Sequence, residues 1–149
     1  MAKFRFQLDP LLRLREREER DRQVDVAKLE RERRGIEDRL REQHASIVKG
    51  QRTLRSSMVG ELDIDALRAH AARSVELDRS ARQLVLELAG AHRRLETARE
   101  ALREARRAKR AIELLKERRY AAWKAGIEKA ETAALDELAV QRASRKETW

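Results

Sequence analysis

The side chains that most often carry out catalysis or bind metals are present in this chain, but they are scattered. The three histidines, His44, His70 and His92, lie far apart, and no two of them have the spacing of metal ligands. The chain has no cysteine, so disulfides and thiolate metal sites are excluded. No GxxxxGKS or GxxxxGKT motif is present, and the five glycines are too dispersed to form a phosphate-binding loop. We therefore expect no enzymatic activity, no cofactor and no metal.

Charge is the other property through which this chain could act on a partner. Of its 149 residues, 36 are basic and 27 acidic, which gives a formal net charge of +9. Four arginines that fall on one helical face form a predicted basic stripe: Arg99, Arg103, Arg106 and Arg110. An acidic protein, a nucleic acid or an anionic membrane could receive this stripe. A merely solvated helix face is the alternative interpretation.

Specific nucleic-acid binding and membrane insertion are not predicted. The basic region lacks interleaved aromatic residues for base stacking, and it lacks the Asn and Arg pattern that reads base edges. No stretch approaches the roughly 18 consecutive apolar residues of a membrane span. The first residues also lack the apolar core of a signal peptide. We expect a cytoplasmic protein without a transmembrane segment.

A heptad pattern predicts the elements that carry these residues. Between positions 67 and 140, apolar or small residues return at alternating steps of three and four. One series is Leu67, Ser74, Ala81, Leu88, Leu95 and Leu102, and the interleaved series is His70, Leu77, Leu84, Ala91, Ala98, Ala105 and Ile112. A mean spacing of about 3.5 residues is typical of a coiled coil. Disorder is the competing interpretation for a chain in which 42% of the residues are charged.

Start and stop signals divide the chain into two helices. Asp9 suits the N-cap of the first, and Pro10 suits its first helical position. Gly60 lies in a break between the helices, and Asp63 suits the N-cap of the second. We predict a single coiled-coil hairpin over 1–149, with helices at about 10–58 and 64–142 and a turn at about 59–63. The predicted fold class is all-α: two long helices in an antiparallel coiled-coil hairpin, with the second helix overhanging.

Matching the two apolar seams predicts the register of the hairpin. The preferred register places Ile36 opposite Leu88 and Leu40 opposite Leu84, whereas a slip of one heptad breaks several leucine pairs. The same register places Arg15 opposite Lys109. Because like charges repel, the pairing is predicted to be weakest there.

The predicted helices differ in length, so the second must overhang. At about 1.5 Å per residue, a helix of about 80 residues outruns one of about 49, and everything past about Lys116 projects. The projecting region contains large apolar residues: Leu114, Leu115, Tyr120, Trp123, Ile127, Leu135 and Leu138. Either a lead-in with alternating Phe4, Phe6 and Leu8 folds onto this region, or another protein covers it. We favour a partner protein.

Motifs at both ends of the chain resemble the flagellar FliJ family of type III export stalk proteins. Residues 4–19 read FRFQLDPLLRLREREE, which has the family's aromatic-alternating start, leucine pair and run of Arg and Glu. Residues 115–123, LKERRYAAW, and 135–142, LDELAVQR, resemble its C-terminal signature. The length, the two-helix layout and the basic composition fit over the entire chain.

The resemblance implies a non-catalytic stalk that binds the hexameric flagellar export ATPase and the membrane export gate and helps to cycle export chaperones. It implies a cytoplasmic protein, monomeric when free, that associates peripherally with the inner membrane at the flagellar base. The matched positions imply that the ATPase contact is formed by Leu8, Leu11, Leu12, Leu115, Arg118, Arg119, Trp123, Ile127, Leu135 and Leu138. Gate-binding residues are not carried over, because the aromatic residues expected around 43–50 and 73–84 are absent.

Three other functions are compatible with this sequence. The equivalent stalk of a virulence-type secretion system shares the architecture. A basic coiled coil associated with nucleic acid would grip phosphates without sequence preference. A dimerising scaffold would use the same heptads between two chains.

Overall fold

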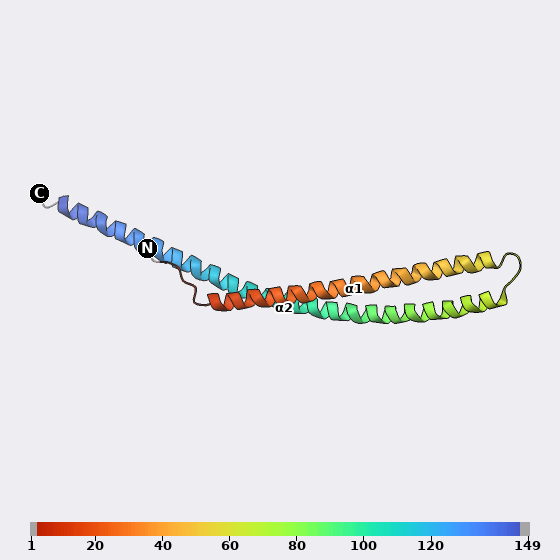
Figure 1. Cartoon of the computed structure of the whole chain (residues 1–149). Helices are drawn as coiled ribbons and strands as arrows, with labels where there is room; N and C mark the ends of the chain where they lie inside the picture. The colour runs from red at the N-terminus through yellow and green to blue at the C-terminus, as the bar shows by residue number, and fades with distance from the viewer. Residues whose placement is uncertain (1–2, 147–149) are drawn as a thin grey trace. The chain divides into compact units, whose positions relative to one another are not determined.

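The chain folds into two long helices that pack against each other. The computed structural model describes residues 3–146, and this part of the chain contains no strand. Helix α1 spans Asp9–Ser57, 49 residues, and α2 spans Ile64–Lys146, 83 residues. The chain reverses direction between them, so the two helices are antiparallel (Figure 1). The predicted all-α helical hairpin is confirmed.

Local capping explains where the two helices meet the turn. The Asp63 carboxylate accepts hydrogen bonds from the backbone N–H groups of Asp65, at 3.0 Å, and Ala66, at 3.2 Å, which caps the N-terminus of α2. Gly60 has a φ of 102°, a conformation that L side chains rarely adopt. Helix α1 begins and ends one residue earlier than predicted, and α2 continues four residues past its predicted end. The residues within one or two helical turns of a boundary determine where such a helix ends.

Contacts divide the chain into two compact units, and both helices run through each. Unit 1 consists of Met1–Glu19 and Glu104–Trp149, and unit 2 of Arg20–Arg103. In unit 2, a buried cluster of Ile36, Leu84 and Ala91 forms the core, and Leu40 and Leu88 pack against it. These are the residues that the predicted register brings together. Large apolar side chains from both helices therefore fill the seam of this unit.

Polar contacts between the helices of unit 2 agree with the same register. Gln43 donates a hydrogen bond of 2.6 Å to the Ser80 hydroxyl, and Arg39 donates one of 3.1 Å to the Glu87 carboxylate. A slip of one heptad would shift one helix by about 10 Å along the other and separate both pairs. These contacts therefore select one alignment among those that the apolar seam alone would tolerate.

Unit 1 combines the chain's first residues with the second half of α2. Phe6, Leu12 and Ala105 are its buried apolar residues among those described. In contrast, every residue from 128 to 145 is exposed. The last turns of α2 in this unit thus present side chains that the described chain does not cover.

Candidate functional site

An aromatic cluster joins the start of the chain to α2 within unit 1. The Phe4 ring lies edge-on to Tyr120 at a centroid distance of 5.3 Å and lies 5.6 Å from Trp123. Tyr120 and Trp123 are one helical turn apart, with their rings 5.7 Å from each other. Such separations are favourable for aromatic pairs. The lead-in therefore folds onto the projecting part of α2, and this part of the surface is covered by the chain itself.

Residues 3–8, which we call the N-terminal strap, are anchored by Phe6. This side chain is only 4% exposed, and its ring lies 5.7 Å from Lys116 Nζ and 5.8 Å from Arg119 Cζ. Both contacts have the geometry of cation–π interactions. Directly after the strap, the Asp9 carboxylate accepts a hydrogen bond of 2.8 Å from Lys116. One buried ring and one ion pair thus hold the strap against α2.

Residue spacing accounts for this docking. Lys116, Tyr120 and Trp123 follow one another at steps of four and three, so they lie on one face of α2. Phe4 and Phe6 are two residues apart in a segment that is neither helix nor strand. The sequence contains both patterns, but a six-residue segment has too little periodicity to predict which surface it will contact.

The predicted ATPase-contact residues differ in exposure. The exposed members are Arg118, Arg119, Leu135 and Leu138. The half-buried members are Leu8, Leu11, Leu115, Trp123 and Ile127. Leu12 is only 9% exposed. Its side chain is buried by the chain itself, and its contact with the ATPase stays a prediction.

Helix geometry also divides the predicted residues between faces of α2. At about 100° per residue, Arg118 points about 160° away from Tyr120, on the other side of the helix. Larger steps bring four other side chains within about 60° of Tyr120. These five residues form what we call the terminal face: Tyr120, Trp123, Ile127, Leu135 and Leu138. Arg118 cannot contact a partner together with them unless that partner surrounds the helix.

The two arginines of the predicted basic stripe that lie in unit 2 are paired with carboxylates. Arg99 donates hydrogen bonds to Glu96, at 2.9 Å, and to Glu30 of α1, at 3.4 Å. These bonds, with Glu96 the larger cause, raise the pKa of Arg99. Arg103 pairs with Glu100.

The two stripe arginines in unit 1 are paired as well. Arg106 contacts Glu19 at 3.3 Å. Arg110 contacts Glu117 at 3.1 Å and Glu113 at 3.3 Å, and the bond to Glu117 is the main cause that raises the pKa of Arg110. Each positive charge of the stripe therefore has a negative neighbour, which weakens its attraction for a distant anionic partner.

Glu19 is the centre of a charged network in the seam of unit 1. Lys109 contacts its carboxylate at 2.5 Å, and the side chain of Glu19 is only 12% exposed. The hydrogen bond from Lys109 lowers the pKa of Glu19, and the same bond raises the pKa of Lys109. Arg15 pairs with Glu18 at 2.9 Å. Arg15 and Lys109 thus each have an acidic partner, which offsets the predicted repulsion between them.

In unit 2, the turn between the helices exposes a second apolar surface. We define the hairpin tip as residues 58–64, whose large apolar side chains are all exposed: Met58, Val59, Leu62 and Ile64. Val59 has the largest exposed fraction of these, 83%. Acidic residues alternate with them at Glu61 and Asp63, and Asp65 follows directly. The tip is therefore apolar and acidic, whereas the chain as a whole carries a charge of +9.

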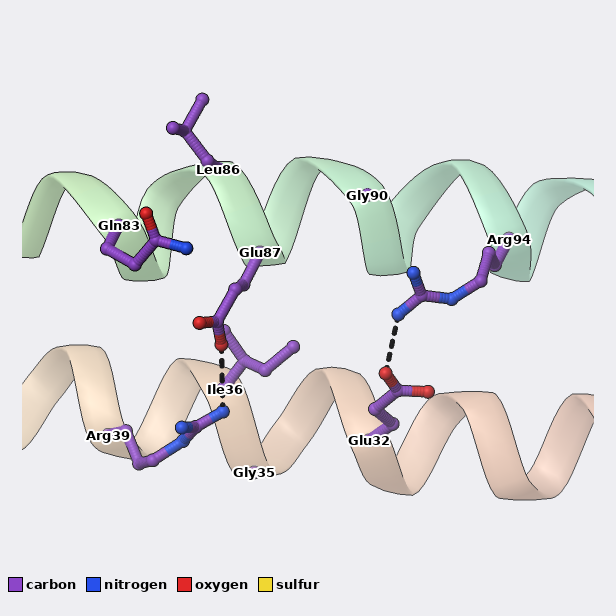
Figure 2. Close-up of a pocket in the computed structure, with 9 residues that line it drawn as sticks. All are labelled: Glu32, Gly35, Ile36, Arg39, Gln83, Leu86, Glu87, Gly90 and Arg94. Atoms are coloured by element: carbon purple, nitrogen blue, oxygen red, sulfur yellow. Dashed lines mark hydrogen bonds and ion pairs between the residues drawn. The ribbon is translucent and has the colours of Figure 1, made fainter.

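A groove between the helices of unit 2 is lined by charged side chains, unlike the apolar tip. Gly35 and Gly90 line it, and two ion pairs cross it, Arg39 with Glu87 and Glu32 with Arg94 (Figure 2). Figure 2 also shows Leu86 pointing away from α1. All four charged side chains of the groove are paired with one another. The groove thus serves to connect the helices and presents no unpaired charged group for chemistry.

Metal-binding and membrane-spanning features are missing from residues 3–146. No group of three or more His, Cys, Asp or Glu side chains in this range could hold a metal ion. None of the helices in the same range is long and apolar enough to cross a membrane.

Comparison with known proteins identifies the family. No curated protein and no solved structure matches the chain. A family model described as Flagellar FliJ protein matches residues 4–148, which include all of the strap except its first residue, the aromatic cluster and the terminal face. This family is a non-catalytic component of flagellar export. Because the match covers nearly the whole chain, the protein belongs to the flagellar FliJ family and is a non-catalytic component of the flagellar export apparatus.

Proposed function

We propose that this chain is the stalk that connects the hexameric export ATPase to the membrane export gate, and that it helps to cycle export chaperones. In this proposal it is a cytoplasmic monomer when free and associates peripherally with the inner membrane at the flagellar base. The ATPase binds the terminal face of α2. One observation carries this assignment: residues 128–145 are all exposed, and they include large apolar side chains on one face of the helix. Leu135 is 66% exposed and Leu138 is 51% exposed.

The terminal face has the properties of a surface that a partner completes. A helix without tertiary packing is only marginally stable in water, and large apolar side chains exposed along it favour association. Fully burying a leucine or isoleucine contributes about 1.5–3 kcal/mol. Burial of Ile127, Leu135 and Leu138 would therefore supply a substantial part of a specific affinity.

The proposed stalk acts by asymmetry and not by chemistry. One helix that contacts six similar subunits makes different contacts with each of them. If these contacts favour one subunit conformation over another, the stalk couples the states of neighbouring subunits. Nucleotide chemistry remains entirely with the ATPase.

The hairpin tip supports a separate site for the export gate. Four exposed apolar side chains next to Glu61 and Asp63 fit an apolar pocket with a basic rim. In this arrangement the two partners bind different units of the chain, unit 1 for the ATPase and unit 2 for the gate.

A reciprocal pair of variants tests both contacts in the full-length protein. We expect Leu135→Glu with Leu138→Glu to weaken ATPase binding at least about tenfold and to reduce ATPase stimulation, because it places charge in a buried apolar contact. The same variant should bind the cytoplasmic domain of the gate normally. Val59→Glu with Leu62→Glu should show the opposite pattern.

These positions are exposed, so circular dichroism should report unchanged helicity for both variants. Wild-type ATPase affinity in the Leu135→Glu, Leu138→Glu protein would refute the ATPase assignment. Wild-type gate affinity in the tip variant would refute the gate assignment alone.

A further inference from the structure

We propose that the N-terminal strap is an autoinhibitory latch that covers part of the terminal face and has to be released before the ATPase binds there. The inference rests on the proposed function, because it concerns access to the same face of α2. The strap is residues 3–8, and both it and the α2 residues against which its rings lie belong to unit 1.

The strap occupies the aromatic part of the face. Phe4 packs on both Tyr120 and Trp123, at centroid distances of 5.3 and 5.6 Å, and Trp123 is half-buried. A partner that approaches the Trp123 indole from this side meets the Phe4 ring first. The strap therefore competes with a partner for the two largest side chains of the face.

The strap also occupies the cations beside the aromatic cluster. Lys116 forms an ion pair with Asp9, and both Lys116 and Arg119 lie against the Phe6 ring. An acidic partner would need these same two cations, since the predicted stripe arginines are already paired with glutamates. Aromatic and cationic contacts on this face are thus both satisfied within the chain.

The way in which the strap is held allows it to be released. Residues 3–6 have no regular secondary structure, and their recorded contacts with α2 are made by side chains. The backbone hydrogen bonds that the strap accepts, at Phe6 from Asp9 and at Leu8 from Leu12, come from the start of α1 and not from α2. Release also restores conformational entropy to the ordered residues, which offsets part of the lost contact energy. Phe4 is the more exposed of the two rings and Phe6 the buried anchor.

A latch of this kind lowers the apparent affinity by the fraction of molecules that are open. If the strap covers the face in about nine molecules of ten, the apparent Kd of the ATPase is about tenfold weaker than the intrinsic one. Removing a strap contact should therefore strengthen binding, whereas removing a residue of the docking face should weaken it. The direction of the change separates a latch from a docking residue.

The test uses full-length protein and the purified export ATPase hexamer. We expect Phe4→Ala and Phe6→Ala each to lower the apparent Kd, by about three- to tenfold. The matched control is Gln7→Ala, an exposed strap residue, which should bind like the wild type. Phe4→Ala is the milder variant, so it remains informative if loss of the buried Phe6 ring disturbs the start of α1.

A second readout does not depend on the ATPase. The chain has two tryptophans, so in a Trp149→Phe background the fluorescence reports Trp123 alone. Phe4→Ala should increase quenching of Trp123 by acrylamide, and Gln7→Ala should not. Unchanged quenching would show that the strap does not cover the indole, and this would overturn the latch.

The binding outcomes separate the latch from the proposed function. If Phe4→Ala binds the ATPase as well as or more weakly than the wild type while Leu138→Glu reduces binding, the latch is wrong and the ATPase site stands. If Leu138→Glu leaves ATPase binding unchanged, the proposed ATPase site is wrong. The latch is then wrong as well, because it would regulate access to that site.

Discussion

At the scale of single residues, the pairing of charges determines how much positive charge this basic chain leaves free for a partner. Spacing along a helix could predict that Arg99, Arg103, Arg106 and Arg110 share a face. The same spacing predicts the pairs within α2, such as Arg99 with Glu96 and Arg103 with Glu100. It could not predict the pairs with Glu30 and Glu19, which reach the stripe from α1 and depend on the register. Surface charge inferred from one helix alone therefore overestimates the free positive charge.

Glu19 gives a pH-dependent prediction at this scale. Lys109 lowers the pKa of Glu19 below its ordinary value of 4.5, so this group stabilises the fold above that pH and loses the contribution as the pH falls. We expect Glu19→Gln to reduce the free energy of unfolding by about 1 kcal/mol at pH 7, since a hydrogen bond between charged groups is lost. The difference from wild type should shrink at pH 3.

Urea denaturation at the two pH values measures this difference. Glu131→Gln, on the exposed part of α2, is the control and should leave stability unchanged at both. At alkaline pH the same ion pair loses its positive partner. Because Glu19 raises the pKa of Lys109 above its ordinary value of 10.5, the contribution of Lys109 to stability is lost only as the pH rises past that value. An equal effect of Glu19→Gln at pH 7 and pH 3 would contradict the assigned ion pair.

At the scale of elements, the helices could be predicted well and the strap could not. Asp63 and Gly60 mark the turn with local chemistry, and large residues such as Ile36 and Leu88 fix the register by filling opposite positions. The strap differs because its docking depends on single rings that meet α2 at positions more than 100 residues further along the chain. No periodic pattern in six residues encodes such a contact.

Two glycines on different elements should respond oppositely to alanine. Gly60→Ala should destabilise the chain by about 1–2 kcal/mol, because its φ of 102° is unfavourable for a residue with a Cβ atom. Gly126→Ala should stabilise the chain by up to about 1 kcal/mol, since a Cβ there meets no atom within 4 Å and alanine favours helix. Chemical denaturation of both variants checks the pair. A neutral Gly60→Ala would show that the turn conformation is not restrictive.

At the scale of the whole molecule, the two units have different roles. Unit 2 holds the helices in register and ends in an apolar, acidic tip, whereas unit 1 carries the strap and the terminal face. Membership of a family of non-catalytic export components agrees with the scattered positions of the histidines and with the lack of a metal-binding cluster in residues 3–146. Composition and heptads could predict a long hairpin with an exposed end, but only the positions of the strap residues reveal that part of this end is covered by the chain itself.

Hydrogen–deuterium exchange of the full-length chain, with and without the export ATPase hexamer, locates the segment that the ATPase covers. Amides in exposed, unpacked helix exchange through frequent local opening, so a partner that covers them slows their exchange. We expect slower exchange in residues 120–140 when the ATPase is added, with little change in residues 29–47. Protection confined to the hairpin tip, with residues 120–140 exchanging as fast as in the free protein, would contradict this expectation.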